Sequence, residues 1–186
     1  MGSISPAIAQ QGVPSVESLE KQLRTKRTAR KAAAQAATLT ALQPLIGEWT
    51  GDAHGDDFEW RASTGTCRMT SLYSYTVKFT DIEPSTATVR GTFRRSFRAQ
   101  KAINSATMAC IRSSPRGSSL GTISANRQDD YEIVVVANIH IEECQQSCDQ
   151  GWSGGDRVKR HLTLRDGTLR YSDSNGALIA VLKPKK

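Results

Sequence analysis

After Pro44, hydrophobic residues recur at every second position through most of the chain. The clearest case is the segment 88–99, where two kinds of side chain alternate: Val89, Phe93 and Phe97 with Arg90, Arg94 and Arg98. Successive side chains of a strand point to opposite faces of a sheet. This period of two therefore predicts strands that bury one face and expose the other.

The same pattern and its interruptions predict a series of strands with short connections. They are expected at residues 46–52, 58–61, 67–80, 88–99, 107–112, 120–125, 131–141, 157–165, 168–172 and 177–183. Asp166-Gly167 and Asn175-Gly176 are typical of two-residue hairpin turns between antiparallel strands. No segment after Pro44 is long enough for crossover helices. The sequence thus predicts a mainly β protein, an antiparallel up-and-down barrel of about eight to nine strands.

A helix is expected before the barrel. Ser15 can cap its N-terminus, and Val16, Leu19 and Leu23 have helical spacing before the alanine-rich stretch 32–37. Three parts follow: a disordered N-terminus at 1–14, a basic alanine-rich α-helix at 15–43 and a β-barrel domain at 44–186. Alanines bury little area, so we expect the helix to dock loosely on the barrel or on another chain.

Charge adds a preference for acidic partners. The net charge is +7 and the pI about 9.5. Two stretches hold basic residues without any acid, six of them between Lys21 and Gly47 and eight between Pro84 and Gln128. Solvated surface is the plain alternative for both. No apolar run reaches the roughly 18 residues of a transmembrane helix, so no transmembrane segment is expected.

Four cysteines, Cys67, Cys110, Cys144 and Cys148, form an even set. They fit two disulfides in an oxidising compartment, and pairings of Cys144 with Cys148 and of Cys67 with Cys110 are favoured; unpaired thiols and metal ligands are the alternatives. Ala7-Ile8-Ala9 is similar to the small-residue end of a secretory signal. We therefore expect a periplasmic or secreted protein.

The first predicted strand contains Gly47-Glu48-Trp49 directly after the helix. A Gly-x-Trp on the opening strand resembles the signature of lipocalins and the broader calycin barrels. The resemblance implies that Trp49 plugs the closed end of the barrel and packs beneath an arginine of a late strand. Arg170, on the penultimate predicted strand, is the candidate for that arginine.

A barrel interior is the default site for a small apolar ligand. The residues expected to bind it are Tyr73, Tyr75, Phe93, Arg95 and Phe97. A packed core without a cavity is the alternative for the aromatic residues. Arg95 falls on the apolar face, where it would need an acid or a ligand anion, unless its strand faces the other way.

A partner surface is expected on the opposite face. Its candidate residues are Arg90, Arg94, Arg98 and, on a loop after the cysteines, Trp152. Phe93 and Phe97 point away from these arginines and no RNA-binding motif occurs, which argues against nucleic acid as the partner. An acidic protein is the expected partner of this face.

No catalytic constellation, metal site or cofactor motif emerges. Cys144 and Cys148 with His140 lack the second ligand pair of a structural zinc site. His54 with Asp52, Asp56 and Asp57 falls in an expected turn, where acids are common for local reasons. The sequence therefore predicts a non-enzymatic exported binding module for an apolar small molecule or a protein. The alternative is an inhibitor or assembly subunit that docks an acidic partner through its basic strand face and helix.

Overall fold

The computed structural model describes residues 15–62, 65–102, 117–128, 133–145 and 154–185. For residues 56–62, 65–71, 98–102 and 145 it describes the backbone alone.

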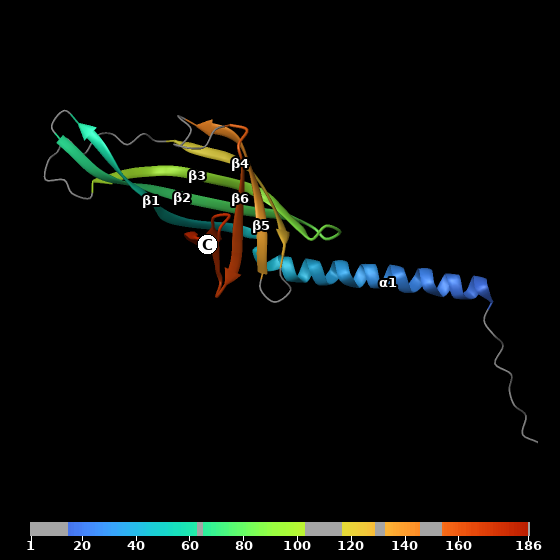
Figure 1. Ribbon diagram of the computed structural model, residues 1–186. Coiled ribbons are helices and arrows are strands. Elements are labelled where there is room, and N and C mark those ends of the chain that lie inside the picture. The colour runs from blue at the N-terminus through green and yellow to red at the C-terminus, as the bar shows by residue number, and fades with distance from the viewer. Residues whose placement is uncertain (1–14, 63–64, 103–116, 129–132, 146–153, 186) are drawn as a thin grey trace, which may run out of the picture.

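Eight strands form one closed antiparallel barrel in which each strand pairs with the next along the chain and the last pairs with the first. They are β1 (Gly47–Ala62), β2 (Gly65–Glu83), β3 (Thr88–Ala102), β4 (Ser118–Arg127), β5 (Ile133–Gln145), β6 (Arg157–Arg165), β7 (Thr168–Ser172) and β8 (Leu178–Pro184). The prediction of an antiparallel up-and-down barrel is confirmed (Figure 1).

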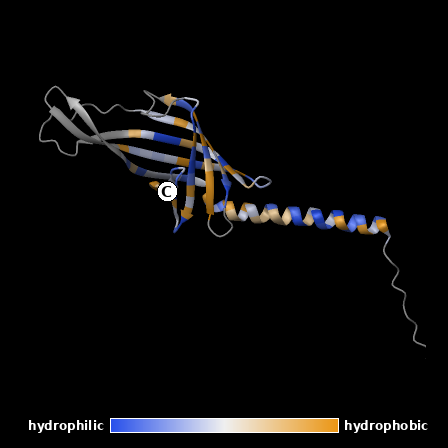
Figure 2. Ribbon diagram, viewed as in Figure 1, coloured by the Kyte–Doolittle hydropathy of each residue, from blue (hydrophilic) through white to orange (hydrophobic). Residues whose placement is uncertain are grey.

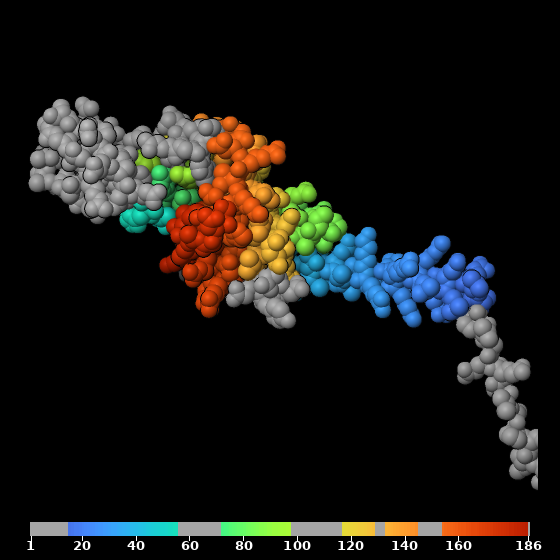
Figure 3. Space-filling model, viewed as in Figure 1, coloured from blue at the N-terminus to red at the C-terminus, as the bar shows by residue number. Residues whose placement is uncertain are grey.

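A single N-terminal helix, α1 (Val16–Leu42), precedes the barrel and ends in a short 3-10 turn, η1 (Gln43–Leu45). The Ser15 side chain accepts a hydrogen bond from the Ser18 backbone N–H at 3.2 Å, which confirms the predicted cap. In Figures 1 and 3 the helix extends away from the barrel as a rod. Leu42 is its one buried residue, and Val16, Leu19, Leu23 and Leu39 are exposed. The helix thus meets the barrel through its C-terminal end.

The first strand is longer than expected. Residues 46–52 and 58–61 were predicted as two strands with a turn around His54, but β1 runs continuously from Gly47 to Ala62. Its pairing with β2 shifts register between His54 and Asp57, as a β-bulge does. Such an extra residue breaks the period of two without ending the strand. The predicted turn is therefore wrong, while the expected strand at 107–112 lies outside the described residues.

The two predicted hairpin turns differ in their outcome. Asp166 and Gly167 both have positive φ, 50° and 69°, as the expected type I′ turn requires. At the second site only Gly176 has positive φ, 87°. There the Asp173 carboxylate accepts hydrogen bonds from the backbone N–H groups of Asn175 and Ala177, both at 2.8 Å, and organises a longer connection. The second two-residue turn is therefore wrong.

Alternation along the strands divides the barrel wall into a buried face and an exposed face, visible as bands of hydropathy along the strands in Figure 2. Leu42, Leu45 and Trp49 belong to the buried core at the end where α1 joins the barrel. The Trp49 indole N–H donates to the Leu45 carbonyl oxygen at 2.8 Å. The helix exit and the first strand thus close this end of the barrel together.

Two glycines allow strands to approach closely inside the wall. A Cβ added at Gly91 would overlap the Lys78 carbonyl oxygen and lie 2.8 Å from the Phe79 Cα. One added at Gly121 would overlap the His140 carbonyl oxygen. Both glycines lie next to or opposite register shifts, between Phe79 and Asp81 and between Leu120 and Gly121. The absent Cβ atoms let the wall bend at these points.

A short seam between β1 and β8 closes the barrel. Trp49 pairs with Pro184 and Thr50 with Lys183. Just beyond, the Lys185 backbone N–H donates to the Glu48 carbonyl oxygen at 2.8 Å, and the Lys185 Nζ lies 2.7 Å from the Glu48 Oε1.

Candidate functional site

Aromatic side chains from three strands meet inside the barrel. Tyr73 and Tyr75 come from β2, Phe93 and Phe97 from β3, and Tyr171 from β7. The ring centroids of Tyr75 and Tyr171 are 5.1 Å apart, those of Tyr73 and Phe97 5.6 Å, and those of Phe93 and Tyr171 6.1 Å. These separations are typical of interacting aromatic pairs. The four aromatic residues expected from the sequence therefore share one inner surface.

Arg95 faces this inner surface. Its side chain is buried, and its Cζ lies 4.3 Å from the ring centroid of Tyr73, a cation–π distance. Arg95 pairs across the wall with Tyr75 on β2 and Ser119 on β4. The expected inward orientation of Arg95 is confirmed.

Tyr171 is the part of this surface that the sequence interpretation missed. Its side chain is fully buried, and its hydroxyl has no hydrogen-bond partner among the described residues. Burial raises the pKa of Tyr171 far above its usual value. The charge of Arg160 opposes this only in part, as do the nearness of the Arg160 N–H groups to the hydroxyl and the charge of Arg95, while Tyr75 adds slightly to the rise. The hydroxyl is therefore neutral and able to donate. The alternation of Leu169 with Tyr171 on a predicted strand was the available signal.

Arg160 on β6 also belongs to the inner side. It is half-buried, and its Cζ lies 6.0 Å from the Tyr171 ring centroid. Its Nη1 donates to the Lys159 carbonyl oxygen at 2.8 Å, while no hydrogen bond of good geometry joins it to the Tyr171 hydroxyl. Arg170, expected above Trp49, is instead exposed, because Leu169 and Tyr171 on either side of it face inward. That expectation is wrong.

Ser119 supplies a second buried hydroxyl. It is fully buried, and its Oγ has no hydrogen-bond partner within the described part of the chain. Its cross-strand neighbour is Arg95. An inward arginine is thus flanked by two buried hydroxyls, Ser119 and Tyr171, in an aromatic surround. We call this arrangement of hydrogen-bond donors and apolar rings the inner site.

The outer face carries the expected basic residues. Arg90 and Arg94 are exposed there, and the side chain of Arg98 lies outside the described part. Arg90 stands opposite Asp81 and near Glu83. The Ser85 hydroxyl and N–H donate to the Glu83 carboxylate, which lowers the pKa of Glu83, and the charge of Arg90 lowers it further. Acids therefore already balance part of the Arg90 charge on its β2 side.

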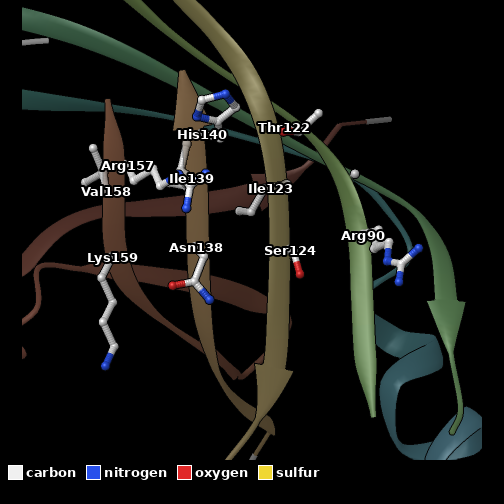
Figure 4. Close-up of a pocket in the computed structure, with 11 residues that line it drawn as sticks. Arg90, Thr122, Ile123, Ser124, Asn138, Ile139, His140, Arg157, Val158 and Lys159 are labelled. Carbon is white, nitrogen blue, oxygen red and sulfur yellow. The ribbon is translucent and has the colours of Figure 1, made fainter. Parts of the chain in front are cut away.

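A hollow of about 570 Å³ crosses the outer face from β3 to β6 (Figure 4). Two cross-strand rows line it: Arg90, Ser124, Asn138 and Lys159 in one, and Thr122, His140 and Arg157 in the other. We call this hollow the outer groove. Cross-strand register brings Arg90 together with these side chains. The sequence analysis did not group them as one site, because they lie far apart along the chain.

The remaining candidates contribute less. Cys144 is half-buried and its thiol is not free; the side chains of Cys67, Cys110 and Cys148 lie outside the described residues, as does Trp152. His54 is exposed on β1. Among the described residues, no group of three or more histidine, cysteine or acidic side chains is placed to hold a metal ion. Within the same part of the chain, no helix is both long and apolar enough to cross a membrane.

No similarity to a known protein adds to what the two faces of the barrel wall show. No protein-family profile, no curated protein and no solved structure matches this chain.

Proposed function

We propose that the barrel is a non-enzymatic binding module whose inner site holds a small apolar molecule with an acidic group. The observation that carries this proposal is the fully buried Tyr171 hydroxyl, which lacks a hydrogen-bond partner among the described residues. A buried polar group without a partner costs about 1–3 kcal/mol of stability. A ligand atom that accepts a hydrogen bond from this hydroxyl would remove that cost.

The surroundings of Tyr171 support an acidic group as the acceptor. Arg95 faces the same interior, and its positive charge acts on Tyr171. The Ser119 hydroxyl is a further buried donor beside Arg95. Donation from hydroxyls and a guanidinium favours an anionic oxygen over a neutral one, because charge-assisted hydrogen bonds are the stronger kind.

The aromatic rings support an apolar body. Register places Tyr73 and Phe97 farther from α1 than Tyr75 and Phe93. Tyr75 and Phe93 are buried, whereas Tyr73 and Phe97 are half-buried. We therefore propose entry from the end of the barrel opposite α1, with the apolar body against Tyr73 and Phe97 and the acidic group toward Arg95 and Tyr171.

Replacing Tyr171 with phenylalanine tests the proposal in two opposite directions. Removal of an unpaired hydroxyl is expected to stabilise the ligand-free protein by about 1 kcal/mol, and removal of a donor is expected to weaken ligand binding about fivefold. A dansylated long-chain carboxylic acid and its methyl ester serve as probes, read by fluorescence. The wild-type protein should prefer the acid, and Y171F should reduce that preference.

The pH dependence of stability provides the check on Tyr171 itself. The pKa of Tyr171 is higher in the folded than in the unfolded state. The contribution of the neutral phenol to the free energy of unfolding is therefore complete below about pH 10 and is lost as the pH rises further. The wild-type protein should lose stability above pH 10 more steeply than Y171F. A destabilised Y171F that still prefers the acid would show that the hydroxyl serves the fold and would overturn the proposed site.

We also propose that the protein is exported and that its cysteines form disulfides. The even number of cysteines and the absence of a free thiol at Cys144 support this proposal. Alkylation with and without prior reduction, followed by mass measurement, is expected to add no label to the unreduced chain and four labels to the reduced one. Four labels without reduction would contradict an oxidising compartment.

A further inference from the structure

The outer groove combines positive charges at its two sides with neutral hydrogen-bonding groups between them. Arg90 on β3 and Lys159 on β6 stand at opposite ends of one cross-strand row, three strand spacings or about 14 Å apart. Ser124 and Asn138 fill the row between them, and Figure 4 shows this order across the strands. Arg157 lies beside Lys159 on β6 and adds a third positive charge.

The polar side chains at the two sides of the groove face solvent. Arg90, Asn138, Arg157 and Lys159 are exposed. Among the described residues, no ion pair engages the side chains of Arg157 and Lys159. None of the described residues that line the groove is an acid. Glu142 lies at its edge and accepts a hydrogen bond from the Thr122 hydroxyl at 3.1 Å, and Asp81 and Glu83 stand on the β2 side of Arg90. The positive charge therefore exceeds the negative charge within the groove.

The lining distinguishes between the classes of anion. Among the described residues that line the groove there is no tyrosine, tryptophan or phenylalanine, and hence no stacking surface of the kind that single-stranded nucleic acid uses. The same residues include no exposed aromatic or large apolar anchor of the kind that dominates protein interfaces. Between the cations, the groove is lined by hydroxyl, amide and imidazole groups, which belong to Thr122, Ser124, Asn138 and His140. Such groups pair with ligand hydroxyls.

His140 strengthens this reading. Its imidazole ring is half-buried and lines the groove. A ligand hydroxyl can both donate and accept, so it can pair with the accessible part of the ring in either tautomer.

We propose that the outer groove binds an anionic carbohydrate, a short chain of sugars that carry sulfate or carboxylate groups. The acidic groups contact Arg90, Arg157 and Lys159, and the sugar hydroxyls contact Ser124, Asn138 and His140. An oligosaccharide of a few residues spans the distance between Arg90 and Lys159. This site lies on the opposite face of the wall from the inner site, so the two can be tested separately.

The test is calorimetric titration of the whole protein with a heparin-derived hexasaccharide at an ionic strength of about 0.15 M, where charges more than about 8 Å apart are largely screened. Lys159→Glu is expected to lower the affinity at least about tenfold, since it removes a charge-assisted contact and adds repulsion. Arg170→Glu is the matched control, because Arg170 is exposed on β7 and does not line the groove. The control should change the affinity less than about twofold, as expected for a screened distant charge.

Asn138→Ala separates hydroxyl recognition from charge. It leaves the net charge unchanged and should lower the affinity about fivefold, the value of one neutral hydrogen bond. All three side chains are exposed, so thermal melts should match the wild-type melt and confirm that each variant is folded.

Four results would overturn the proposal. They are no measurable binding of the hexasaccharide, equal loss in R170E and K159E, an unchanged affinity in N138A, and equally tight binding of polyglutamate or a single-stranded oligonucleotide of matched charge. The last result would assign the groove to an acidic protein or to nucleic acid. None of the four bears on the dansylated acid, which reports on the interior alone.

Discussion

Replacing Gly91 with alanine is expected to lower the free energy of unfolding by about 3 kcal/mol, the upper part of the range for overpacking. The added Cβ would overlap the Lys78 carbonyl oxygen and lie 2.8 Å from the Phe79 Cα. Both are backbone atoms of the neighbouring strand β2, so no side-chain rotation relieves the clash. The β2–β3 pairing must separate locally. Thermal unfolding followed by circular dichroism measures the effect, expected as a fall in Tm of about 6–12 °C.

Gly154 offers the matched control for this substitution. Among the described residues, a Cβ there would meet the Glu142 carbonyl oxygen alone, at 3.9 Å, which is an ordinary contact. G154A should therefore leave the Tm within about 2 °C of the wild-type value. Equal stability of G91A and the wild-type protein would mean that β2 and β3 do not approach as closely as described.

Trp49→Ala is expected to lower the free energy of unfolding by about 4 kcal/mol, as is usual when a buried aromatic side chain is truncated. Trp49 is buried where the helix exit meets the barrel, and Leu42 and Leu45 belong to the same core. Removal of the indole leaves a cavity in this core and deletes the hydrogen bond to the Leu45 carbonyl oxygen. Urea unfolding with and without the substitution gives the free-energy difference.

Trp49→Phe distinguishes the two contributions. Phenylalanine retains most of the buried ring but cannot donate to the Leu45 carbonyl oxygen. We therefore expect W49F to lower the free energy of unfolding by about 1–2 kcal/mol. A loss in W49A no larger than in W49F would show that the hydrogen bond, and not packing, is what Trp49 contributes to closing this end.

The barrel was predictable because its strands obey local rules. Residues 89–95 alternate regularly, and Val89, Phe93 and Arg95 of their inward set are buried. Asp166-Gly167 adopts the backbone conformation that its residue types prefer. The helix likewise follows from alanine content and the Ser15 cap. In each case the information lies within a few neighbouring residues.

The sites were only partly predictable because they depend on cross-strand register and on barrel closure. Tyr171 meets Tyr75 and Phe93 across the interior, and no sequence period links β7 to β2 or β3. The outer groove depends on the pairing of Asn138 with Ser124 and Lys159. The register shift between His54 and Asp57 likewise hid the continuity of β1, because a bulge interrupts alternation as a turn does.

The short junction of β1 with β8 makes one line of the wall easier to open than the others. Few backbone pairs hold it, and Pro184 contributes no N–H. Amide protons of Thr50 and Lys185 should therefore exchange with solvent deuterium sooner than those at the centre of the β2–β3 pairing, through local opening without global unfolding. Such breathing would transiently bare two unpaired strand edges, the state from which neighbouring molecules could exchange strands.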